Sequence, residues 1–173
     1  MGMYYSITAD KTTNCEDDFP ESLSHFFEQV GGCGDKSEVM QVSRILEIDL
    51  SVFQLYDYGT TNVKKEKRYW QCLDRFASIV EAFIKKISEN PDYYKKVLHN
   101  NDYDSQMNKI MYAKDEDSLL KVVEELYSDP STSFPPDRGY LSQNEIMDDL
   151  IALKGLLDCY KESRATKIKL TYV

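Results

Sequence analysis

The feature that most constrains the fold is an apolar stripe through residues 63–88. Large apolar side chains recur there at steps of three and four residues, at Trp70, Leu73, Phe76, Val80, Phe83 and Ile87. That spacing puts them along one side of an α-helix, and Ala77, Ile79 and Ile84 widen the stripe. The pattern therefore predicts a long helix over 63–88 at the centre of the core.

Two segments near the ends of the sequence alternate between apolar and polar residues instead. MYYSIT at 3–8 and KIKLTYV at 167–173 both have the period of two that is typical of half-buried strands. In the second segment, Lys167 and Lys169 would face solvent, as lysines do on edge strands. We expect short strands here, and their pairing with each other is left open.

The intervening sequence is predicted to be mainly helical. Residues 38–58 fit two patterns. Val42, Ile45, Leu46 and Leu50 could share one helical face, but residues 46–56 are rich in β-branched side chains and alternate between apolar and polar, which favours a strand there. Asn90-Pro91 is typical of a helix start, and Ser142 with Glu145 forms a capping box before another helix. The sequence thus predicts an α+β fold: a mostly helical single domain over 1–173, with short N- and C-terminal strands in a small sheet.

The charge is distributed in blocks. The chain has 30 acidic and 21 basic residues, a net charge of −9, with −8 in residues 1–60, +4 in 61–114 and −5 in 115–173. Nucleic acid and anionic membranes need clustered Lys and Arg, so neither is expected as the main partner. Large fields of one sign mainly set the choice of partner, which favours binding to a basic protein.

The cysteines indicate neither a zinc site nor a disulfide framework. Cys15, Cys33, Cys72 and Cys159 have no metal-ligand spacing with each other or with the two histidines, so no metal or cofactor is expected. No secretion signal and no apolar run of membrane-spanning length is present. These features predict a cytoplasmic protein with reduced thiols, in which Cys72 and Cys159 are small core residues.

The sequence offers no catalytic motif. Residues 31–37, GGCGDKS, resemble a phosphate-binding loop, but Asp35 interrupts the required Gly-Lys-Ser succession. His25 and His99 lie near no nucleophile at a suitable spacing, although a pairing in space such as His25 with Cys33 stays open. We therefore expect no enzymatic activity.

The candidate partner-binding residues combine carboxylates with tyrosine. Tyr suits interface anchors because it combines area, a hydroxyl and a small loss of entropy, while flanking carboxylates would meet basic groups of a partner. These candidates are Glu16, Asp17, Asp18, Tyr56, Asp57, Tyr58, Asp102, Tyr103 and Asp104.

The apolar pattern also supports a resemblance. An N-terminal MYYSIT strand, a helix with Trp70, Leu73, Phe76 and Phe83, the run from Gly139 to Leu157 and a closing KIKLTYV strand cover about half of the chain. In this the chain resembles small cytosolic immunity proteins of bacterial polymorphic and contact-dependent toxin systems. The resemblance implies a non-enzymatic protein that binds a cognate toxin domain, often a nuclease, and occludes its active site or substrate surface.

Two other classes stay open. One is a small acid/base hydrolase, which predicts a cleft lined by two or more carboxyl groups with raised pKa values. The other is an adaptor or homo-oligomer assembled through the 63–88 helix, which predicts exposed apolar surface on that helix.

Overall fold

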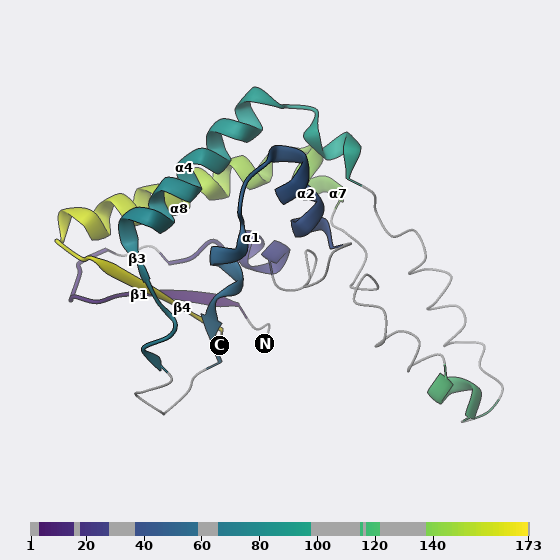
Figure 1. Cartoon of the computed structure of the whole chain (residues 1–173), viewed down its shortest axis with the longest axis horizontal. Helices are drawn as coiled ribbons and strands as arrows, with labels where there is room; N and C mark the ends of the chain where they lie inside the picture. Colours follow the sequence, from purple (N-terminus) through teal and green to yellow (C-terminus); the bar gives the residue numbers. More distant parts are fainter. Residues whose placement is uncertain are drawn as a thin grey trace.

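The computed structural model describes residues 4–15, 18–27, 37–58, 66–97, 115, 117–121 and 138–172. Helices cover one face of a small mixed sheet, in which the first and the last described strands lie side by side (Figure 1). The α+β class predicted from the sequence is thereby confirmed. The elements are β1 (Tyr5–Ala9), α1 (Glu21–His25), α2 (Glu38–Leu46), the 3-10 helix η2 (Ser51–Gln54), β2 (Tyr56–Asp57), β3 (Trp70–Cys72), α4 (Leu73–Glu89), the 3-10 helix η3 (Tyr93–Lys96), α7 (Arg138–Ser142), α8 (Glu145–Glu162) and β4 (Lys167–Tyr172).

The strand nearest the C-terminus, β4, is the centre of the sheet. β1 pairs with it antiparallel on one side, with Tyr5 opposite Tyr172. On the other side β2 pairs parallel to it and β3 antiparallel, with Trp70 opposite Lys169. The two strands predicted at the chain ends therefore pair with each other, and β4 lies inside the sheet, although its lysines resemble those of edge strands.

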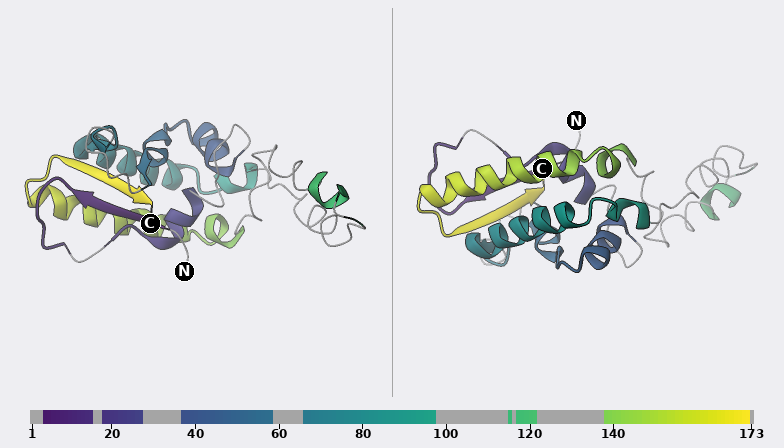
Figure 2. Two further views of the ribbon diagram at one scale, coloured as in Figure 1. Left: turned by 90° about the horizontal axis from the view of Figure 1, so that it is seen from below. Right: turned by 90° about the horizontal axis from the view of Figure 1, so that it is seen from above.

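The core lies between the sheet and two long helices. α4 and α8 run side by side over one face of the sheet in both views of Figure 2. Each helix buries an apolar stripe, which includes Phe76, Val80 and Phe83 of α4 and Leu150 and Leu153 of α8. The apolar pattern in the 63–88 segment thus identified the central helix of the core correctly.

The predicted start of that helix was wrong. α4 begins at Leu73, because Trp70–Cys72 form β3 and pair with β4. Trp70 therefore lies in the sheet, where Lys169 Nζ is 5.5 Å from the centre of its ring and 2.7 Å from Glu66 Oε1. Pairing with β4 therefore holds Trp70–Cys72 in a strand, where the apolar periodicity alone predicted the first turns of the helix.

The strand predicted at 46–56 was mostly wrong. The helix α2 continues to Leu46, and Glu47 ends it in the left-handed conformation with a φ of 52°. The Asp49 carboxylate then accepts a hydrogen bond from the Ser51 backbone N–H at 3.0 Å and leads into η2. Only Tyr56–Asp57 are in a strand, because only these two residues reach β4.

Two predicted helix starts also differ from the structure. Asn90 follows the C-terminus of α4, where its side-chain amide donates to the Lys86 carbonyl at 2.9 Å, and a single 3-10 helix follows it. At the capping box, Ser142 ends α7, and Asn144 precedes α8 with a φ of 66°. In both places, residues that suit a helix start lie at the junction of two consecutive elements.

The cysteine predictions were wrong for three residues. Cys15, in the segment after β1, forms a disulfide with Cys159 of α8, across a sequence separation of 144 residues. Cys72 is exposed at the junction of β3 and α4, so it is not a core residue. The isolated positions of these cysteines in the sequence gave no signal of the pairing.

Candidate functional site

Four aromatic rings gather on the inner face of the sheet, at the end where β4 finishes. We call Tyr5, Tyr56, Tyr58 and Tyr172 the tyrosine cluster. The Tyr56 ring is central, with centroids 5.1 Å from Tyr5, 5.0 Å from Tyr58 and 5.7 Å from Tyr172. The hydroxyl groups of Tyr56 and Tyr58 are 2.8 Å apart, so one donates a hydrogen bond to the other.

The register of the sheet explains why these residues meet. Tyr56 pairs with Leu170, so its side chain lies on the same face as Leu170 and Tyr172. Tyr5 is directly opposite Tyr172 on the neighbouring strand and points to the same face. Tyr58 follows two residues after Tyr56, and its ring contacts Tyr172 edge-on, with centroids 5.6 Å apart. Three segments far apart in the sequence thus contribute to one cluster.

Burial within the cluster is graded from the core to the surface. Tyr5 is fully buried and Tyr172 is 8% exposed, whereas Tyr58 is 65% exposed. Each close aromatic pair contributes about 0.5–1.5 kcal/mol to stability beyond the burial of its area. The contacts with Tyr56 and Tyr172 therefore hold the exposed Tyr58 ring in place. A ring that is already held in place loses less entropy when it binds a partner. The arrangement suits an interface anchor.

The predicted site residues in this region separate into two groups. Tyr56 and Tyr58 belong to the tyrosine cluster, as an aromatic contact surface would require. Asp57, between them, is only 2% exposed, and its pairing with Thr171 puts it on the other face of the sheet. Asp57 therefore does not present a surface carboxylate beside the two rings.

Asp18 has a clear structural position. Its Oδ1 atom accepts hydrogen bonds from the backbone N–H groups of Phe19 at 2.7 Å and Ile7 at 3.2 Å. The Ile7 group is on the edge of β1 that faces away from β4. Asp18 thus covers part of a strand edge, although its side chain is also accessible to solvent.

The remaining predicted site residues lie outside the described part of the chain. They are Glu16, Asp17, Asp102, Tyr103 and Asp104. Conversely, the sequence-based selection missed Tyr5 and Tyr172. The signal for them was present, because both fall on the apolar side of alternating strands, but it needed the pairing of the two strands.

Side chains also satisfy the outer edge of β1 at other points. The buried Ser24 Oγ accepts a hydrogen bond from the Tyr5 backbone N–H at 2.6 Å. From α8, the Tyr160 hydroxyl donates to the Ile7 carbonyl oxygen at 3.2 Å. Together with Asp18, these groups occupy positions at which another strand would otherwise bind.

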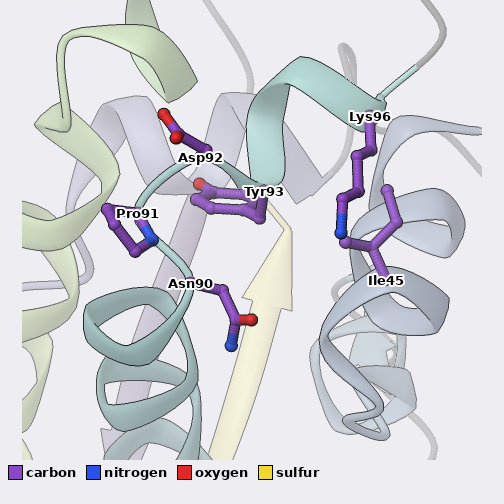
Figure 3. A pocket seen from close by; sticks show the side chains of 6 residues that line it. All are labelled: Ile45, Asn90, Pro91, Asp92, Tyr93 and Lys96. Carbon is purple, nitrogen blue, oxygen red and sulfur yellow. The ribbon is translucent and has the colours of Figure 1, made fainter.

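A shallow pocket of about 110 Å³ lies where α4 ends (Figure 3). Figure 3 shows the Tyr93 ring between the chain at Asn90 and the side chains of Ile45 and Lys96. Tyr93 is almost completely buried, and burial raises the pKa of its hydroxyl. The charged residues that line the pocket are Asp92 and Lys96. A pocket of this size could hold only a few polar atoms.

The carboxyl group of Asp149 belongs to a structural contact. Burial is the main cause that raises the pKa of Asp149, and it also raises that of the Tyr140 hydroxyl, which donates to Asp149 Oδ2 at 3.0 Å. Asp149 also accepts from the Leu23 backbone, so it connects α8 to α7 and α1. The hydrolase alternative requires at least two carboxyl groups with raised pKa values in a cleft, whereas Asp149 is engaged in these contacts between helices.

The histidine and the basic run considered in the sequence lie on the surface where the structure describes them. His25 is exposed on α1, and its suggested partner Cys33 lies outside the described residues. Lys67 and Arg68, from the basic run before β3, are exposed. Within the described ranges no group of three His, Cys, Asp or Glu residues could hold a metal ion.

Comparison with known proteins leaves this geometry as the main guide to function. No protein-family model, no curated protein and no solved structure matches the chain. In addition, every helix in the described ranges is too short or too polar to cross a lipid bilayer.

Proposed function

We propose that this chain is a binding protein that neutralises a cognate toxin domain, and that the tyrosine cluster forms part of its contact surface. The observation that carries the proposal is the exposed Tyr58 ring, held by Tyr56 and Tyr172 on a buried aromatic base. Such amphipathic rings are enriched among the residues that dominate binding energy in protein interfaces. The resemblance to bacterial immunity proteins supplies the class of partner.

The proposed mechanism is stoichiometric occlusion without chemistry. The net charge of −9 would steer the chain to a basic surface, such as the nucleic-acid cleft of a nuclease, and accelerate encounter. Tyr58 would then enter a pocket beside the active site and slow dissociation. Since Asp57 is buried, the steering must come from carboxylates elsewhere on the surface.

Co-expression with a candidate toxin domain, chosen from the reading frames next to the gene for this chain, tests the proposal. We expect the wild-type chain to restore growth and to form a one-to-one complex with the purified toxin domain. Tyr58→Ala should weaken that complex by about 2 kcal/mol, which is roughly 30-fold in Kd, because an anchor ring is lost. Isothermal titration calorimetry measures the change.

Ile151→Ala is the matched control. Ile151 is 54% exposed on α8, so its loss removes a similar apolar area from another surface. Neutralisation of the toxin with unchanged affinity in Tyr58→Ala would remove the tyrosine cluster from the proposal. Failure of the wild-type chain to bind or protect would reject the toxin partner itself.

We further propose that this activity takes place in the cytoplasm, where such toxins act on their targets. The Cys15–Cys159 disulfide makes the location testable, because disulfides rarely persist in a reducing cytoplasm. Alkylation of thiols in intact cells should label the Cys15 and Cys159 peptides if the chain is cytoplasmic. Both peptides will stay unlabelled if the chain resides in an oxidising compartment.

A further inference from the structure

The disulfide joins the segment that follows β1 to the helix α8. In both views of Figure 2 the chain after β1 turns back and runs beside β1 and α8 toward α1. Cys15 belongs to this returning segment, and Cys159 belongs to α8, next to Tyr160, which donates to Ile7 of β1. We call residues 10–15 the clamp segment.

Much of the middle of the clamp segment is exposed to solvent. Lys11, Thr12 and Asn14 are exposed, so they contribute little apolar burial that could offset the entropy of ordering. Asp10 anchors one end through its hydrogen bonds to Thr166. Toward the other end, Asp18 accepts from Ile7 N–H at 3.2 Å, a contact worth about 1 kcal/mol in net terms.

The structure therefore assigns a regulatory role to the bond: the Cys15–Cys159 disulfide is a redox-controlled clamp, whose reduction releases the clamp segment from α8 and, through the nearby Asp18, uncovers the Ile7 backbone N–H. Both cysteines are half-buried, so a small thiol can reach them. The Ile7 N–H group is then accessible to water, while Ser24 and Tyr160 keep their hydrogen bonds to β1. This inference is independent of the proposed toxin partner.

The chemistry is ordinary thiol–disulfide exchange. A thiolate of glutathione attacks one sulfur, the S–S bond breaks, and a mixed disulfide forms while the other cysteine leaves as a thiolate. A second glutathione thiolate then displaces the first cysteine. The protein gains two electrons and two protons as two thiols, and two glutathione molecules become one glutathione disulfide. Glutathione disulfide reverses the reaction.

Limited trypsin digestion of the folded protein tests the clamp at a natural cleavage site. Lys11 is exposed within the clamp segment, and Lys95 in η3 provides an exposed reference site distant in sequence. With dithiothreitol, we expect cleavage after Lys11 to become faster by about tenfold or more relative to cleavage after Lys95, because only the clamp segment opens locally. Mass spectrometry of the early fragments gives both rates.

Variants separate the clamp from other effects of the reductant. Cys15→Ser should cleave rapidly at Lys11 with or without dithiothreitol, whereas Cys72→Ser should respond as the wild type does. Hydrogen exchange gives a second readout, in which reduction should accelerate the Ile7 amide about tenfold or more relative to Leu170 at the centre of the sheet.

Two outcomes would overturn the inference. Equal rates at Lys11 before and after reduction would mean that the segment is held without the disulfide. A parallel increase at Lys11 and Lys95 would mean that reduction acts only through the stability of the whole domain and does not open the clamp segment locally.

Discussion

Acidic side chains in the segment after β1 hold backbone groups in place. Asp10 binds both the backbone N–H of Thr166, at 2.9 Å, and its hydroxyl, at 2.7 Å, just before β4 begins. Asp18 similarly accepts from two backbone N–H groups. In the sequence these residues are indistinguishable from solvated surface acids, because hydrogen bonds to distant backbone leave no local pattern.

The Asp10 contacts predict a strongly shifted titration. The side-chain hydrogen bond from Thr166, followed by that from its backbone, lowers the pKa of Asp10 from 3.8 to about 2. A lowered pKa stabilises the folded state fully above the unfolded value, and this contribution is lost as the pH falls toward 2. Carboxyl NMR titration should give a value near 2, and Thr166→Val should move it back toward 3.8. An Asp10 pKa near 3.8 in the wild type would contradict the hydrogen bonds.

Ser24 gives a second prediction for a single residue. Ser24→Ala removes the hydroxyl acceptor of the Tyr5 backbone N–H at a site that is 1% exposed. We expect a loss of about 1–3 kcal/mol in the free energy of unfolding, because a buried donor loses its acceptor. Urea denaturation measures the change, with Ser22→Ala, at an exposed position of the same helix, as the control. Equal stability of the two variants would refute the role of this bond.

At the scale of elements, the long helices were easier to predict than the strands. Their stripes in α4 and α8 extend over several turns, and each turn repeats the signal. β3 and η2 are only three and four residues long, and they depend on contacts with distant segments. Trp70 fits the helical stripe as well as a strand, so only its pairing with Lys169 decides between them.

The same contrast applies to the candidate site. The sequence indicated Tyr56 and Tyr58 because they are tyrosines that flank a carboxylate, and the structure brings their rings together. The sequence could not reveal that Asp57 is buried. β2 is only two residues long, and the direction of its side chains depends on its pairing with β4. Tyr5 and Tyr172 were missed because their contact is set by the register of strands at opposite ends of the chain.

The packing of α4 leads to a prediction for this element. Phe83→Ala should lower the free energy of unfolding by about 3–5 kcal/mol, because Phe83 is fully buried and its loss leaves a cavity. Ile151→Ala on the exposed side of α8 should change it by no more than about 0.5 kcal/mol. Chemical denaturation of both variants checks the difference. A small effect at Phe83 would mean that the helix is not central to the core.

At the scale of the whole molecule, one covalent bond spans most of the sequence. The Cys15–Cys159 disulfide closes a loop across a separation of 144 residues. On the loop-entropy account, a loop of that length stabilises the folded state by about 5 kcal/mol. The disulfide thus links distant parts of the chain covalently, as the sheet links them through hydrogen bonds.

Stability measurements on cysteine variants test this contribution. Cys15→Ser and Cys159→Ser should each lower the free energy of unfolding by up to about 5 kcal/mol, and the double variant should match either single variant, because all three lack the same bond. Cys72→Ser, which alters an exposed thiol, should behave as the wild type. Additive losses in the double variant would contradict a shared bond.

The position of β4 at the centre of the sheet also affects how the chain folds as it leaves the ribosome. β1 emerges early, yet its hydrogen-bonding partner is the last of the described strands to be made. At typical rates of translation, roughly 10–30 s separate the two events. During that interval the aromatic side chains of the nascent N-terminal strand have no sheet to join, and a chaperone that binds extended apolar segments could protect them.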